Sequence, residues 1–217
     1  MWVTAICLLP VASQAQYVYE SPQDLAKKAV EAYTDERYED AFVEFMKINK
    51  SDTAYFDSRI DAILCASALG HNDTIIDVAN EALSVKKHYN PSEKVFINAI
   101  AVAYNNKEEH EKALEVLEDG LKKYPDYALM HQNQGTAYAG LKKYDEAVKS
   151  FQMAIRYDPK SYLPHYKLGL ICAYNGDLTK AMLCFNMACL IRTSSGNGTA
   201  ILVTLEELGN GKLEKDS

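Results

Sequence analysis

The side chains best suited to chemistry in this 217-residue sequence are five histidines, which are dispersed at positions 71, 88, 110, 131 and 165. Nucleophilic catalysis needs a serine or cysteine activated by a histidine, and the local sequence suggests no such arrangement. The sequence also has no glycine-rich loop of the phosphate-binding type. We therefore predict that the chain is not an enzyme and requires no cofactor.

Two of these histidines, His131 and His165, are 34 residues apart. Such a pair could act as a ligand pair or as a pH sensor. The same spacing recurs at many other residues of the chain, which favours the alternative that both histidines are half-buried packing residues.

Four cysteines lie beyond the N-terminal segment, namely Cys65, Cys172, Cys184 and Cys189. Their even number permits disulfides in an exported chain, and their disulfide state stays open. No CxxC motif or His-Cys cluster offers the spacing of metal ligands, so no metal site is predicted. All four fall in segments with helical periodicity, and we expect them to act as small apolar packing residues.

The charge balance argues against nucleic acid as a partner. The chain has 23 basic and 30 acidic residues, a net charge of -7. Proteins that bind nucleic acid present a basic stripe to the phosphates, and the sequence has none. Its apolar content of 48% is sufficient for a folded core.

The N-terminal residues 1–15 are uncharged and end in small residues, as a signal peptide does. We expect cleavage after Ala15 and export to the periplasm. The apolar run is too short to span a bilayer, so no transmembrane segment is predicted. No Lys or Arg precedes Lys27. The alternative is therefore a cytoplasmic protein in which this segment forms an extra helix.

A period of 34 residues organises the rest of the chain. Ala113, Ala147 and Ala181 have this spacing. The same period relates Tyr104 to Tyr138, Phe151 to Phe185, Gly135 to Gly169 and Pro125 to Pro159. Each half of the period shows apolar residues at i, i+3, i+4 and i+7, which is typical of an amphipathic helix. The sequence thus predicts pairs of helices.

The segment 128–161 resembles the tetratricopeptide repeat. Its matching residues are Gly135, Tyr138, Tyr144, Ala147, Phe151, Ala154 and Pro159. The resemblance implies an all-α fold, a right-handed superhelix of antiparallel helix pairs in which each repeat contacts only its neighbours. Small residues such as Gly135 and Ala147 would let the paired helices approach closely.

Five such units cover most of the sequence, at 22–55, 56–93, 94–127, 128–161 and 162–195. The second unit fits only with four inserted residues near Val85 to Asn90. Residues 199–208 then predict a capping helix that begins at Thr199 and covers the last unit. Residues 209–217 are predicted to form a disordered tail.

In the tetratricopeptide family the first helix of each pair lines a concave face. Its second, fifth, ninth and twelfth repeat positions point into this groove, and the resemblance implies a protein or peptide partner there. In the third unit the positions are Val95, Asn98, Val102 and Asn105. The fourth and fifth units supply Leu129, Gln132, Thr136, Ala139, Leu163, Tyr166, Leu170 and Ala173.

The leading hypothesis is an exported scaffold that binds a segment of a partner protein through this face. A cytosolic adaptor or co-chaperone is one alternative. The family's clamp for a chaperone's terminal carboxylate is matched only in part, because Val102 stands where an Asn is needed. An accessory subunit of an enzyme or transport complex is the other alternative. The partner's identity and the oligomeric state stay open.

Overall fold

The computed structural model describes residues 20–85, 90 and 92–193, and these residues form ten helices and no strand. The all-α class expected from the sequence is confirmed. The helices are α1 (Pro22–Thr34), α2 (Tyr38–Met46), α3 (Tyr55–Ala68), α4 (Asn72–Ser84), α5 (Glu93–Asn106), α6 (His110–Lys123), α7 (Ala128–Gly140), α8 (Tyr144–Tyr157), α9 (Tyr162–Tyr174) and α10 (Leu178–Thr193).

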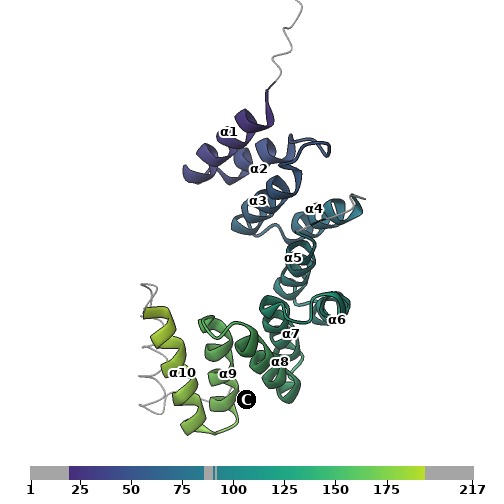
Figure 1. The fold of residues 1–217 in the computed structure, drawn as a ribbon. Coiled ribbons are helices and arrows are strands. Elements are labelled where there is room, and N and C mark those ends of the chain that lie inside the picture. Colours follow the sequence, from purple (N-terminus) through teal and green to yellow (C-terminus); the bar gives the residue numbers. More distant parts are fainter. Residues whose placement is uncertain (1–19, 86–89, 91, 194–217) are drawn as a thin grey trace, which may run out of the picture.

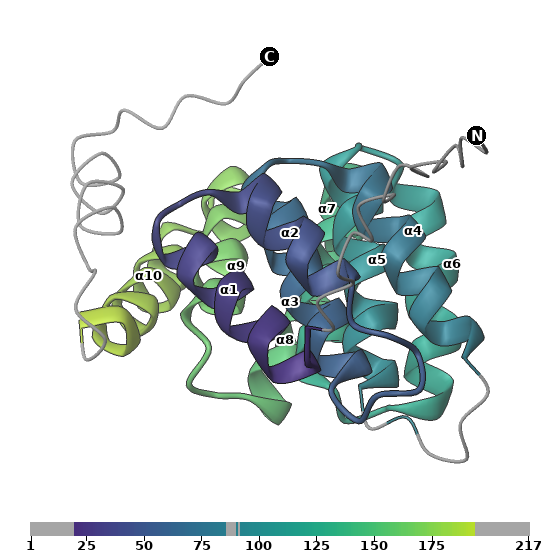
Figure 2. The ribbon, with the colours of Figure 1, turned by 90° about the horizontal axis from the view of Figure 1, so that it is seen from above.

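Each helix packs against the next helix along the chain, from α1 on α2 to α9 on α10. This stacking produces a curved rod in which α1 and α10 lie at opposite ends (Figure 1). The view from above also places α4 and α6 on the outer side of the curve (Figure 2). The predicted solenoid of helix pairs is therefore confirmed.

The two helices of every pair are joined by the same type of turn. One residue of each turn is left-handed, with φ of 60° at Glu36, 72° at Gly70, 61° at Glu108, 59° at Lys142 and 80° at Gly176. The N–H of the next residue donates to the carbonyl five residues earlier, at 2.8 to 2.9 Å. This hydrogen bond satisfies a carbonyl at the helix end and reverses the chain.

The last two pairs are held together by a glycine that faces a phenylalanine. A Cβ atom on Gly135 would lie 2.7 Å from the ring of Phe151, and one on Gly169 would lie 2.8 Å from the ring of Phe185. Both rings are completely buried. The absence of a side chain on the first helix therefore lets the second helix place an aromatic ring directly against it.

A buried arginine lies where the first pair meets the second. Arg59 of α3 donates from Nη1 to the carbonyl of Phe45 (3.0 Å), and from Nη2 to those of Met46 (3.3 Å) and Ile48 (3.1 Å). Its guanidinium also lies 4.4 Å from the ring centre of Tyr55. Arg59 thus satisfies the carbonyls at the end of α2 and ties that helix to α3.

Several sequence predictions fall outside the described residues. They are the signal peptide at 1–15, the capping helix at 199–208 and the tail at 209–217. Residues 86–89, within the expected insertion, also lie outside. Among the helices that the structure does describe, none has both the length and the apolar character needed to cross a membrane.

Candidate partner-binding groove

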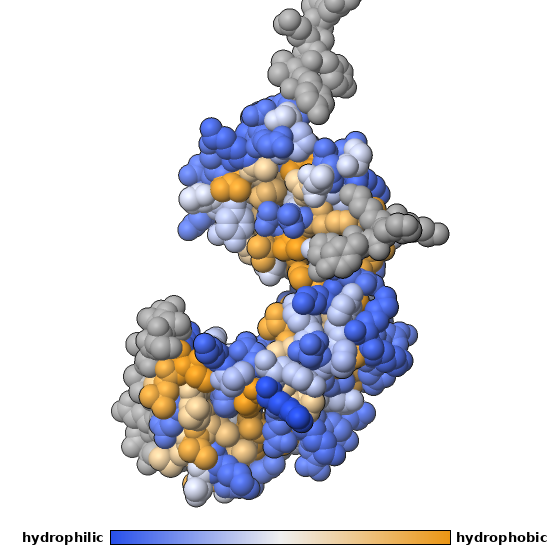
Figure 3. Space-filling view, viewed as in Figure 1, coloured by the Kyte–Doolittle hydropathy of each residue, from blue (hydrophilic) through white to orange (hydrophobic). Residues whose placement is uncertain are grey.

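The inner side of the curve is formed by the first helices of the pairs. Helix α5 contacts both α3 and α7, so these three first helices are neighbours in space. The space-filling view shows that the rod encloses an open hollow between its two ends (Figure 3). Side chains that project from this inner side are the candidates for binding a partner.

The predicted asparagines of α5 take part in a hydrogen-bond chain with α7. Asn133 Nδ2 donates to Asn98 Oδ1 at 2.8 Å, and Asn105 Nδ2 donates to the carbonyl of Asn133 at 3.0 Å. His110 Nδ1 lies 3.1 Å from Asn105 Oδ1. These amides therefore hold neighbouring repeats together, and only part of their hydrogen-bonding capacity is left for a partner.

The other predicted residues of α5 and α7 remain accessible. Leu129 is 42% exposed. Val95, Val102, Gln132 and Thr136 are all half-buried. The Thr136 hydroxyl donates to the carbonyl of Gln132 within the same helix, at 3.1 Å. This part of the groove combines aliphatic side chains with an amide.

The predicted residues of α9 are half-buried, but Tyr166 also belongs to the internal packing. Its ring centre lies 5.6 Å from that of Phe185, and both Tyr166 and Leu170 pack against the buried cluster of α10. Leu170 and Lys167 also line a pocket of about 270 Å³ beside α7 and α8. Replacement of Tyr166 would therefore disturb the core as well as the groove.

Our sequence reasoning missed the part of the groove formed by α1 and α3. Val30, Tyr33 and Leu64 are 54%, 41% and 50% exposed, respectively. Together with Phe45 and Asp61 they line a pocket of about 130 Å³. The signal was available, because Val30, Tyr33 and Leu64 occupy the same repeat positions in the first two units that were used for the last three.

Asp61 is the polar group of this pocket. Burial, and secondly the neighbouring Asp57, raise the pKa of its carboxyl. In the described part of the chain neither Asp57 nor Asp61 forms an ion pair. The pocket therefore combines exposed apolar side chains with a carboxylate that lacks a cationic neighbour.

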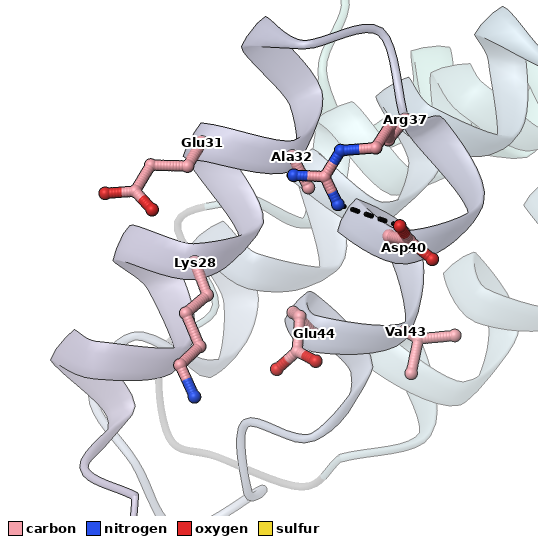
Figure 4. A pocket seen from close by; sticks show the side chains of 7 residues that line it. All are labelled: Lys28, Glu31, Ala32, Arg37, Asp40, Val43 and Glu44. Atoms are coloured by element: carbon pink, nitrogen blue, oxygen red, sulfur yellow. Dashed lines mark hydrogen bonds and ion pairs between the residues drawn. The ribbon is translucent and has the colours of Figure 1, made fainter.

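A second hollow, of about 350 Å³, lies on the α1–α2 pair. Figure 4 shows Arg37 directed at Asp40, and these two side chains form an ion pair of 2.8 Å. Glu44 of the same hollow pairs with Lys47 at 2.6 Å. Because these charges neutralise one another, this hollow is a weaker candidate for a binding site.

The two equivalent histidines lie in packed positions. His131 is buried, its Nε2 donates to the carbonyl of Pro125 at 2.8 Å, and its ring stacks on Tyr157. Burial is the larger influence on His165 and lowers the pKa of its imidazole. Within the described residues no group of three or more His, Cys, Asp or Glu side chains could hold a metal ion. The contacts of His131 and the burial of His165 support the packing interpretation.

Comparison with known proteins gives matches in both sequence and fold. The TPR repeat family pattern matches residues 135–176. Superkiller complex protein 3 of Homo sapiens is 35% identical over 101 residues, which are 44% of this chain and 6% of the relative. The chain thus spans less than a tenth of that protein.

Solved structures match over most of the described solenoid. TTC0263, a thermophilic TPR protein of Thermus thermophilus, has a TM-score of 0.69 and 19% identity, covering 88% of this chain and 100% of its own. MamA of Desulfovibrio magneticus RS-1 has a TM-score of 0.62 and 16% identity, covering 81% and 97%. At these identities the likeness concerns the fold alone. The chain thus resembles tetratricopeptide-repeat proteins in the sequence of residues 135–176 and shares their solenoid fold.

Proposed function

We propose that this chain is a non-catalytic scaffold that holds a segment of a partner protein along its concave face. The observation that carries the proposal is the accessibility of the predicted residues on three successive first helices. They remain half-buried or exposed, although the second helix of each pair covers the opposite side. A groove of this kind suits an extended peptide or a helix.

The chemistry of the groove supports this partner class. Leu129, Leu163 and Leu170 offer apolar contacts for side chains of a bound segment. Gln132 and Asn98 supply amides that can hydrogen-bond to a peptide backbone. Because the apolar residues come from different repeats, the bound segment would run across several helices.

Export to the periplasm is part of the proposal and rests on the character of residues 1–15. Sequencing of the mature N-terminus in the native cell tests it. A protein that begins at Gln16 agrees with export. An intact Met1 contradicts it and favours a cytosolic adaptor or co-chaperone.

A second candidate function is that of a subunit in a larger complex. It is favoured by the name of the human relative, which places that protein in the superkiller complex. Size-exclusion chromatography of native extract separates the two candidates, because a stable subunit would elute with its complex and a scaffold with a transient partner would not.

Affinity capture with a matched pair of variants tests the scaffold proposal. Leu129→Glu places a charge in the groove, and Val43→Glu places one on α2, where Val43 is similarly exposed at 53%. We expect Leu129→Glu to lose the captured partner and Val43→Glu to retain it, with unchanged helicity by circular dichroism in both. Equal capture by the two variants would remove the groove from the proposal.

A further inference from the structure

The groove surface at α1 and α3 differs in character from the groove surface at α5 to α9. Its three exposed apolar side chains, Val30, Tyr33 and Leu64, come from two repeats and surround one opening. Phe45 of α2 also lines the opening, whose volume of about 130 Å³ is smaller than a typical small-molecule site. The opening is therefore on the scale of one side chain of a partner.

The carboxylate of Asp61 lies in the same opening, and Asp57 precedes it by one helical turn on α3. Both burial and Asp57 act against ionisation of Asp61 and raise its pKa. An apolar ligand alone would bury this carboxylate further without compensation. A ligand that places a cation beside it would relieve the unfavourable environment and form a charge-assisted hydrogen bond.

The half of the molecule that surrounds this opening is negatively charged, as Asp57 and Asp61 are. Residues 20–84 contain 14 acidic and 6 basic side chains, a net charge of -8. Residues 92–192 contain 12 acidic and 13 basic side chains, a net charge of +1. The long-range field at α1 to α4 therefore attracts cationic segments, whereas the field of the other half does not select by charge.

We propose that the α1–α3 end of the groove binds a basic, apolar segment of a partner protein. One aliphatic side chain of the segment enters the opening between Val30, Tyr33 and Leu64. A neighbouring Lys or Arg pairs with Asp61 and Asp57. This inference rests on the proposed scaffold function and adds the chemistry of the partner. An acidic segment would be repelled by Asp57 and Asp61.

Measuring how fluorescein-labelled twelve-residue peptides bind to the full chain provides a direct test. The peptides alternate Lys with Leu, Glu with Leu, or Lys with Ser, and anisotropy reports binding at moderate ionic strength. We expect the Lys-Leu peptide to bind about tenfold more tightly than the other two. Asp61→Asn should weaken the binding of the Lys-Leu peptide by a similar factor. Asp77→Asn, the same charge change at an exposed site of the outer helix α4, should leave binding within about twofold.

The possible outcomes are distinct. If the Lys-Leu peptide does not bind, binds no better than the Glu-Leu peptide, or is equally affected by Asp61→Asn and Asp77→Asn, the inference is overturned. If captured native partners depend on Leu129 but not on Asp61, the inference fails while the scaffold function stands. A self-associated form of the chain that Leu64→Ala dissociates would assign the opening to a second copy and would also overturn the inference.

Discussion

The second helix pair and the last two have the same backbone plan but different ways of filling the space between helices. In α7–α8 and α9–α10 a glycine on the first helix faces a phenylalanine on the second. At the equivalent positions of α3 and α4 the sizes are reversed, because Ile63 lies on the first helix and Ala79 on the second, and both are buried in one cluster. The repeat therefore keeps the combined volume of the two positions, and the identity of each residue can vary.

The largest loss of stability is expected from changing the glycine–phenylalanine contact of the α7–α8 pair. Phe151→Ala removes a fully buried ring and should lower the free energy of unfolding by about 3–5 kcal/mol, as measured by urea denaturation. Gly135→Ile alone should also destabilise, since its Cβ would lie 2.7 Å from the ring. The double variant reproduces the arrangement of Ile63 and Ala79. It should be more stable than the sum of the single changes predicts, by about 2 kcal/mol. If the two substitutions changed the free energy of unfolding additively, the idea that these two positions share one volume would be contradicted.

A somewhat smaller loss of stability is expected from removing Arg59, which joins α2 to α3. Arg59→Leu leaves three carbonyls at the end of α2 without their donor and should destabilise the chain by about 3 kcal/mol. Thermal or urea unfolding measures the change. Arg156→Leu is the matched control, because Arg156 is exposed on α8, and it should change stability by less than about 0.5 kcal/mol. Equal losses of stability in the two variants would contradict a stabilising role for the hydrogen bonds of Arg59.

The smallest effect is expected in the third pair, α5–α6, which lies between the pairs compared above. Lys123 Nζ and Tyr124 Oη both donate to Glu93 at 2.7 Å and lower the pKa of its carboxyl. A lowered pKa in the folded state gives stability that is present above the unfolded value and lost as the pH falls through the folded value. At neutral pH, Glu93→Gln should therefore be less stable than the native chain by under about 1 kcal/mol. The difference should begin to shrink as the pH falls below the unfolded pKa of about 4.3 and vanish once the pH is below the lowered pKa of Glu93, and a difference that persists in strong acid would rule out this linkage.

The helix pairs could be predicted from the sequence, because a fixed period places equivalent residues on equivalent faces of the helices. Of the predicted groove positions, Leu129 is exposed and Leu163 half-buried, and their role in binding stays a prediction. The second role of Tyr166 was not accessible, since its contact with Phe185 depends on how closely α9 approaches α10. The hydrogen bonds of Asn98 and Asn105 likewise could not be predicted, because they join two different repeats and the pattern of a single repeat does not contain them.

The weak second unit was hard to recognise for a physical reason. Its reversed pair, Ile63 and Ala79, satisfies the packing but departs from the residue types by which the family is recognised. Arg59 also has no counterpart in the sequence pattern. The pocket at α1 and α3 was missed for a simpler reason, because the groove positions were applied only to the units that matched the family best.

The recurring left-handed turn determines where this chain can change in length. Its marker residues are spaced by 34, 38, 34 and 34 positions, from Glu36 through Gly70, Glu108 and Lys142 to Gly176. Helices α4 and α5 have ordinary lengths, so the four additional residues lie between one pair and the next. Insertions within a pair would break the hydrogen bond that closes it, whereas the connections between pairs can lengthen. A rod of this plan can therefore be lengthened or shortened by whole pairs without breaking the turn inside any of them.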